Sequence, residues 1–220
     1  NTMAATPVAA HRGVWGIRFT DGDPASGGGP QGALAHDTAP MQGSYYVRSW
    51  VRMMPVTATG STELLAIKSP QLDLSLLYVS YPGGGLYVGG YGASSTFIGT
   101  ETDAGLVSGQ WHLVELGLSG VGTAAGTRRA WLDGRPIASA NVDLQGPVDR
   151  VTELALGQPW ADDRGYVGAI DFDDARVGTE PPASTLALLG PSSLEVGACT
   201  PYQVALRTSD GASAAAPYPL

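Results

Sequence analysis

The sequence contains only one cysteine and one lysine among its 220 residues, Cys199 and Lys68. A single cysteine excludes any disulfide within the chain. In a secreted protein an unpaired cysteine favours a partner elsewhere, so we expect further domains of the same polypeptide beyond residue 220. The three histidines, His11, His36 and His112, are scattered singly and lack the spacing of a tetrahedral zinc site.

Positive charge and long apolar runs are scarce as well. Lys and Arg number 12 against 20 Asp and Glu, which gives a net charge of −8 and an isoelectric point near 4.7. Nucleic-acid binders usually carry a basic footprint, so this balance argues against a nucleic acid partner. No run of about 18 apolar residues occurs, and we therefore expect no membrane span. Residues 1–13 lack the charged and apolar regions of a signal peptide, as a mature secreted chain also would.

Glycine and proline are abundant instead, at 31 and 16 residues, while charged residues make up only 15%. Frequent turn residues leave little sequence for long amphipathic helices. From Gln110 to Val177, short stretches rich in β-branched, aromatic or leucine residues are separated by Gly, Asp-Gly or Pro: QWHLVELGLSG, TRRAWLDGRPI, ELALGQP and YVGAIDFDDARVG. This punctuation is typical of antiparallel strands joined by tight turns, so we predict an all-β fold.

The order of these four stretches carries a resemblance. A Trp-led strand ending in Ser-Gly, a Trp-Leu-Asp-Gly-Arg hairpin, a Leu-Gly strand end and a final Gly-x-Ile-x-Phe-Asp-Asp-x-Arg-Val strand together resemble the second half of a concanavalin A-like (laminin G-like) jelly roll. The resemblance implies a two-sheet antiparallel sandwich over residues 1–180. Lectins, adhesion modules, glycosidases and polysaccharide lyases share that fold, so function must be argued from a site.

The most informative strand of the first half is SYYVRSWVRMM, residues 44–54. A period of two sends Tyr45, Val47, Ser49, Val51 and Met53 to one face, which we predict to be core. The other face carries Tyr46, Arg48, Trp50 and Arg52. Rings that stack on a pyranose and guanidinium groups that bind hydroxyls or carboxylates suit a sugar, so this is the candidate glycan site, with Trp50 as its central residue. The alternative is that each Arg packs on its aromatic neighbours and covers the sheet.

A second aromatic stretch, YPGGGLYVGGYG, spans residues 81–92. Its alternation places Tyr87 and Tyr91 on one side of a strand and Leu86 and Val88 on the other. We expect the two tyrosines to form an open platform beside the candidate glycan site. In the preceding strand, the same alternation predicts that the leucines and the tyrosine share one face: Leu72, Leu74, Leu76 and Tyr78.

Acidic residues gather on the predicted closing strand and in an early loop. By its Asp-Asp-Ala-Arg-Val tail this strand is similar to the closing strand of family 16-type glucanases and related sandwiches, which implies that Asp173 helps to hold a structural Ca²⁺ near the N-terminal strand. Asp171 on the same strand and Asp21 and Asp23 in the loop DGDPASGGGPQ are the further candidate ligands. The loop carboxylates are also ordinary turn residues.

The alternative for the closing strand is an Asp–Arg pair. Three carboxylates on a strand bound for burial are costly unless each finds donors or a cation. Arg18 or Arg176 would supply such donors, with Asp174 as the expected acceptor.

Catalytic motifs are largely missing. Sandwich glycosidases use two nearby carboxylates, yet no Glu-x-Asp-x-x-Glu pattern occurs here. Alginate-lyase relatives carry an Arg-x-x-x-Arg strand and a Gln-x-His strand; Arg48 and Arg52 have the first spacing, but LLAIKS stands where the histidine is expected. His112 is expected to be a structural histidine, and no Gly-x-Ser-x-Gly elbow is present. The sequence therefore favours a role without catalysis.

The composition changes after Val177. Residues 181–185 are a Pro-rich linker, and residues 186–220 resemble the first two strands of a bacterial Ig-like domain, an incomplete set that is marginal alone. We expect a secreted or cell-surface bacterial module that binds glycan or mediates adhesion. The alternatives are a polysaccharide lyase or glycoside hydrolase that uses the same concave face, and a structural spacer of a larger adhesin.

Overall fold

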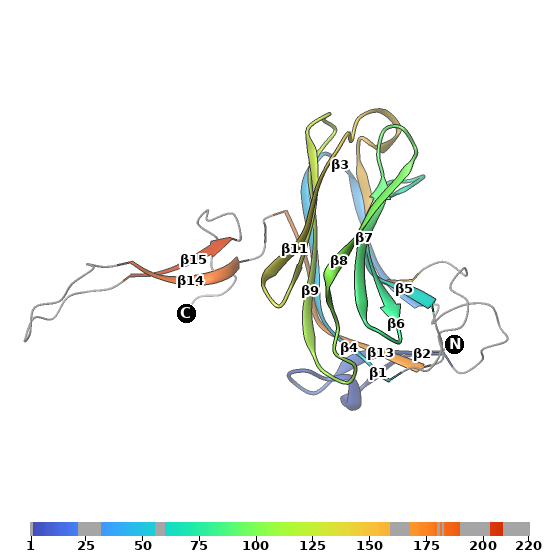
Figure 1. Ribbon diagram of the computed structural model, residues 1–220, viewed down its shortest axis with the longest axis vertical. Helices are drawn as coiled ribbons and strands as arrows, with labels where there is room; N and C mark the ends of the chain where they lie inside the picture. The colour runs from blue at the N-terminus through green and yellow to red at the C-terminus, as the bar shows by residue number, and fades with distance from the viewer. Residues whose placement is uncertain are drawn as a thin grey trace, which may run out of the picture.

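The computed structural model describes residues 2–21, 32–55, 60–158, 168–179, 181, 183–189 and 203–208. These residues form two antiparallel sheets that lie face to face, with no α-helix among them (Figure 1). None of them belongs to a helix long and apolar enough to cross a membrane. The all-β, two-sheet sandwich predicted from the sequence is confirmed.

The larger sheet, called sheet A here, has seven strands in the order β1-β2-β13-β4-β9-β10-β11. Their bounds are β1 (Thr2–Thr6), β2 (Gly16–Asp21), β4 (Gly43–Met53), β9 (His112–Val121), β10 (Gly126–Leu132), β11 (Arg135–Val142) and β13 (Gly168–Gly178). Two short 3₁₀ turns, η1 (Pro7–Ala9) and η2 (Gly146–Val148), join strands. Residues 10–15 form a loop that precedes β2.

The second sheet, called sheet B, has six strands in the order β3-β12-β5-β6-β7-β8. Their bounds are β3 (Gly32–Met41), β5 (Gly60–Lys68), β6 (Asp73–Tyr81), β7 (Gly85–Tyr91), β8 (Phe97–Gly105) and β12 (Val151–Gln158). From β5 to β8 the strands are neighbours both in sequence and in space, which is a simple meander. Within the part of the chain that the structure describes, β14 (Ala183–Leu189) and β15 (Gln203–Thr208) form a separate two-stranded sheet. The Ig-like assignment of this region stays a prediction.

The core lies between the two sheets and consists of the inward set of each alternating strand. On β4 the predicted core face is confirmed, because Tyr45, Val47, Ser49, Val51 and Met53 are all 2% exposed or less. The predicted Asp133-Gly134 hairpin is also confirmed: both residues have positive φ, 50° and 75°, as a two-residue type I′ turn requires.

The prediction that the leucines of β6 share one face with Tyr78 is wrong. Leu74 points into the core, whereas Leu76 and Tyr78 lie on the outer side of sheet B. The reason is a β-bulge, since Ile67 pairs with Ser75 but the next residue, Lys68, pairs with Asp73. The extra residue, Leu74, reverses the alternation.

The bulge also frees the carbonyl of Leu74 from the strand ladder. The buried guanidinium of Arg128 on β10 donates to this oxygen from Nε (3.1 Å) and Nη2 (2.6 Å), and further to the carbonyl of Ile98 (3.3 Å). Arg128 therefore links sheet A to sheet B through backbone acceptors. Burial without a partner anion lowers the pKa of Arg128 to about 10.

Candidate functional site

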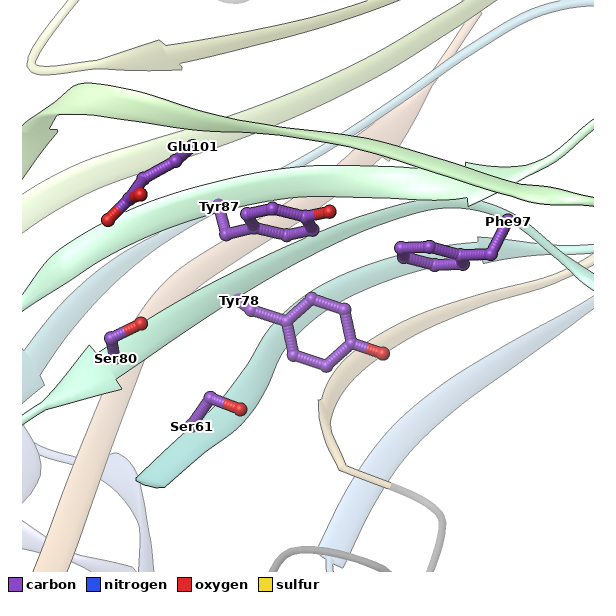
Figure 2. Close-up of a pocket in the computed structure, with 6 residues that line it drawn as sticks. All are labelled: Ser61, Tyr78, Ser80, Tyr87, Phe97 and Glu101. Carbon is purple, nitrogen blue, oxygen red and sulfur yellow. The ribbon is translucent and has the colours of Figure 1, made fainter. Parts of the chain in front are cut away.

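An open hollow lies on the outer face of sheet B. It has a volume of about 510 Å³ and is lined by residues from β5, β6, β7 and β8: Ser61, Tyr78, Ser80, Tyr87, Phe97 and Glu101. Figure 2 shows the rings of Tyr87 and Phe97 roughly in line, with Tyr78 below them and Ser61, Ser80 and Glu101 at one end. The hollow thus brings aromatic and polar side chains together on one concave surface, as ligand sites do.

Strand alternation and register place these side chains together. On β7, Leu86 and Val88 enter the core, as predicted, so Tyr87 points outward. Tyr87 pairs with Tyr78 on β6 and with Glu101 on β8. Directly opposite residues share a face, and the three side chains therefore form one row across three strands.

Two glycines allow the aromatic rings to lie on the sheet. A Cβ at Gly99 would collide with the ring of Tyr87, and a Cβ at Gly89 would collide with the ring of Phe97. The rings of Tyr87 and Phe97 are within 7° of parallel, with centroids 6.4 Å apart, and Tyr91 meets Phe97 edge-on at 5.3 Å. With centroids 6.4 Å apart, the two near-parallel rings are offset from each other and together form an aromatic platform.

The polar groups of the hollow are available to a ligand. Among the described residues, no hydrogen bond or ion pair involves the side chains of Ser61, Ser80 or Glu101, and all three are exposed. Hydroxyls can donate or accept, whereas a carboxylate only accepts. The hollow thus offers ring faces for an apolar surface and oxygen atoms at its margin.

A buried charge cluster lies on the same face, beside Tyr78. The ammonium of Lys68 is 3.6 Å from carboxylate oxygens of Asp73 and Glu153 and 4.0 Å from Glu63, which pairs with Tyr78 across β5 and β6. Lys68 and Glu63 are 4% and 3% exposed. The single lysine of the chain is therefore surrounded by three carboxylates.

The residues predicted from β4 lie elsewhere. Tyr46, Arg48, Trp50 and Arg52 share the outer face of sheet A, as predicted, and are half-buried. The expectation that Tyr87 and Tyr91 lie beside them is wrong, because those tyrosines belong to sheet B on the opposite side of the sandwich. The structure brings Tyr87 and Tyr91 together with Phe97 and not with the β4 residues.

Most of the β4 face is occupied by contacts within the protein. The ring of His11 stacks on Trp50 at 3.9 Å, and the guanidinium of Arg52 lies 4.7 Å from the centre of the Trp111 ring. Arg52 also donates to Asp171 (2.7 Å) and to the carbonyl of Val8 (2.6 Å). Residues 8–11 thus cover part of this face, and the alternative of cation-π packing describes Arg52.

Arg48 pairs with a carboxylate that burial has perturbed. Its Nη1 is 3.7 Å from Oε1 of Glu115, the neighbouring residue on β9. Burial raises the pKa of Glu115 to about 7, although the charge of Arg48 acts in the opposite direction. Glu115 is 2% exposed, so its carboxylate is inaccessible to a large ligand.

The predicted metal ligands Asp171 and Asp173 use their oxygens on protein donors. Asp171 is fully buried and lies between Arg18 and Arg52, its direct neighbours on β2 and β4, at 2.6 and 2.7 Å. Two guanidinium groups would repel a cation at this carboxylate, so Asp171 does not fit a Ca²⁺ site. The Asp–Arg alternative is present, but through Asp171 rather than Asp174.

Asp173 holds the N-terminal loop. Its Oδ2 accepts from the backbone N–H of His11 (2.7 Å) and Arg12 (3.0 Å), and its Oδ1 accepts from the N–H of Asp174 (2.8 Å). The described residues contain no group of three or more His, Cys, Asp or Glu that could hold a metal ion. Asp23 and the side chain of Asp21 lie outside the described residues, and Ca²⁺ binding there stays a prediction.

His112 is structural, as predicted. Its Nε2 accepts the backbone N–H of Val107 at 3.0 Å, which leaves Nδ1 to donate to Asp133 at 2.8 Å. Both ring nitrogens are therefore engaged at the end of the sandwich.

Of the residues that line the hollow, only Tyr87 was predicted from the sequence as a site residue. Tyr78 was predicted to share a face with Leu74, and no candidate site residue was predicted in β8, which carries Phe97 and Glu101. The available signal was the spacing of Gly89 and Gly99 beside aromatic residues, because glycine within a strand often marks a close approach. The pairing of β7 with β8 was needed to join these residues into one site.

Comparisons with solved structures identify similar folds. An endo-β-1,4-glucuronan lyase from the fungus Trichoderma reesei matches with a TM-score of 0.64 and 16% identity, over 81% of this chain and 87% of that chain. A cellulose-induced protein, Cip1, matches with a TM-score of 0.56 and 16% identity, over 81% and 86%. The receptor-binding domain of botulinum neurotoxin type G matches with a TM-score of 0.52 and 7% identity, over 80% and 40%.

At these identities the similarity shows the fold alone, which is the jelly-roll sandwich implied by the sequence. No protein-family model matches the chain, and no curated protein matches it in sequence.

Proposed function

We propose that this chain binds a glycan in the hollow on sheet B, without cleaving it, as a module of a secreted or cell-surface protein. The observation that carries the proposal is the platform of two parallel rings, Tyr87 and Phe97, set side by side over glycines. Aromatic faces of this kind stack on the apolar faces of pyranose rings, and the hydroxyls of Ser61 and Ser80 are placed to bind sugar hydroxyls.

The arrangement along the sheet suits an extended polymer. Tyr87 and Phe97 come from neighbouring strands, and Tyr91 extends the aromatic surface beyond Phe97. The hollow is open and its lining is partly exposed, so a chain could enter and leave at either end. The glucuronan lyase and the cellulose-induced protein, whose names refer to polysaccharides, support a carbohydrate ligand for this fold.

The β4 face is the weaker location for this activity. A ligand on Trp50 would have to displace the His11 ring, and a ligand on Arg52 would have to compete with Asp171 and the Val8 carbonyl. Separating buried charge-assisted hydrogen bonds costs about 1.5 to 3 kcal/mol each. The hollow on sheet B requires no such displacement among the described residues.

The test is affinity electrophoresis and a glycan array with wild type, Tyr87→Ala and Phe97→Ala. We expect each substitution to weaken retention by up to about tenfold, because stacking on one aromatic ring is worth roughly 0.5 to 1.5 kcal/mol. Trp50→Ala is the matched control, since it removes an aromatic ring from the opposite sheet. Loss of retention in Trp50→Ala alone would move the site to sheet A.

The same assay addresses the remaining alternatives. New reducing or unsaturated ends after incubation with a bound polymer would favour a hydrolase or lyase. Absence of binding to any glycan would favour a structural spacer or an adhesion module that binds protein. A loss of binding in EDTA would support the predicted Ca²⁺ at Asp21 and Asp23.

A further inference from the structure

The outer face of sheet B carries more negative than positive charge. Lys68 is the only Lys or Arg in the six strands of this sheet. Its ammonium is enclosed by Glu63, Asp73 and Glu153, so these carboxylates exceed its charge. Glu101 adds a further carboxylate in the hollow itself.

The positive charges of the chain lie mainly on the other sheet. Of the twelve basic residues, eight belong to the strands of sheet A or to the loop before β2: Arg12, Arg18, Arg48, Arg52, Arg128, Arg129, Arg135 and Arg176. In the sequence next to the strands of sheet B, the stretches 22–31 and 56–59 contain no Lys or Arg, while Arg150 precedes β12 and Arg164 follows it. A polymer of uronic acid units would therefore bring its carboxylates toward a negative surface.

Glu101 is placed to act on a bound sugar. It pairs with Tyr87 across β7 and β8, and its exposed carboxylate lies beside the Tyr87 ring (Figure 2). No described residue donates to it. A cation that contacts this carboxylate also lies next to the ring of Tyr87, whose face attracts positive charge.

We propose that the hollow selects glycans with free amino groups, such as de-N-acetylated hexosamine polymers, and that Glu101 is the residue that sets this preference. The inference rests on the glycan-binding function proposed above and names its ligand class. In such a complex a pyranose stacks on Tyr87 and Phe97, while a sugar ammonium donates to Glu101. Uronate polymers are disfavoured because no free cation of the described residues faces them.

The experiment is isothermal titration of the full chain with three oligomers of equal length: a β-1,4-linked glucosamine oligomer, its N-acetylated form and a glucuronate oligomer. The pH is 6, where the amines are largely protonated. We expect the glucosamine oligomer to bind about fivefold more tightly than the N-acetylated one, because one exposed ion pair contributes up to about 1 kcal/mol. The glucuronate oligomer should bind most weakly. The preference should decline as salt is raised from 20 to 300 mM.

Glu101→Gln should bring the two hexosamine oligomers to equal affinity while it retains binding to the N-acetylated form. The control is Asp174→Asn, which makes the same charge change at an exposed residue of β13 in sheet A, where asparagine tolerates the local φ of 49°. It should leave the preference unchanged.

The possible failures are distinguishable. If the N-acetylated oligomer binds and Tyr87→Ala abolishes that binding, but wild type shows no amine preference, the selectivity is overturned and the binding site stands. Equal losses of preference in Glu101→Gln and Asp174→Asn would assign it to overall charge and overturn the role of Glu101. Failure of every oligomer to bind would overturn both proposals.

Discussion

At the scale of single residues, Glu115 shows how burial and a weak partner shape the pH response. Its pKa is raised from 4.5 to about 7 because burial penalises the charged form more than Arg48, at 3.7 Å, stabilises it. A carboxyl group on an outer sheet face thus remains protonated in the folded state under mildly acidic conditions.

The raised pKa of Glu115 makes the folded protein less stable as the pH rises. Between pH 4.5 and 7 the unfolded chain loses the Glu115 proton while the folded chain keeps it, so the free energy of unfolding falls as the pH rises. Above pH 7 both states are ionised and the loss is complete. We expect Glu115→Gln to gain stability relative to wild type from pH 4 to pH 8, by up to about 3 kcal/mol.

Urea denaturation of both proteins at pH 4, 6 and 8 measures this difference. All other titrating groups are common to the two proteins, so their contributions cancel in the comparison. A difference that stays constant with pH would show that Glu115 titrates normally.

At the scale of elements, the pair of β7 and β8 determines the shape of the hollow. The ring of Tyr87 lies across Gly99, and the ring of Phe97 lies across Gly89. An alanine at Gly99 meets only the end of the Tyr87 side chain, which can move away from the sheet. The substitution should therefore preserve the fold but break the flat platform.

We expect Gly99→Ala to weaken glycan binding about fivefold and to change the melting temperature little, because a misplaced ring loses roughly 1 kcal/mol of stacking. Gly178→Ala is the matched control, since a Cβ at Gly178 in β13 meets nothing within 4 Å. Glycan titration with thermal unfolding measures both effects. Equal binding by the two variants would show that the ring positions seen in the hollow are not required.

Some features of individual strands could be predicted from local sequence, and others could not. The alternation of β4 and the Asp133-Gly134 turn were predictable, because side-chain period and turn chemistry are local properties. The bulge at Leu74 was not, since it depends on how β5 pairs with β6. Because of this one extra residue in β6, Tyr78 lies on the face opposite Leu74, whereas simple alternation predicts that the two share a face.

At the scale of the whole molecule, the sequence predicted the sandwich but not the division of the aromatic residues between its two sheets. The β4 residues and the β7 tyrosines are both outward-facing, and only long-range pairing assigns β4 to sheet A and β7 to sheet B. The Arg–Asp row of Arg18, Asp171 and Arg52 likewise joins three strands that are far apart in sequence. Local periodicity contains no information about either arrangement.

Arg128 connects the two sheets, and its removal tests that connection. Arg128→Met would leave the buried carbonyl of Leu74 without this donor and would remove the hydrogen bond to the carbonyl of Ile98, which should destabilise the protein by about 2 to 3 kcal/mol. Arg135→Met is the control, because Arg135 is exposed at the start of β11 and should change stability by less than about 0.5 kcal/mol. Urea unfolding compares them, and equal stabilities would contradict the role of Arg128.

The positions of β12 and β13 also bear on how the chain is made. Each is synthesised late, yet each is an interior strand: β13 separates β2 from β4, and β12 separates β3 from β5. While the chain emerges from the ribosome, β2 and β4 therefore have no shared neighbour, and the strand edges that pair with β13 await residues 168–178. Such non-local pairing slows folding, so the nascent sandwich depends on protection from aggregation until both late strands have been added.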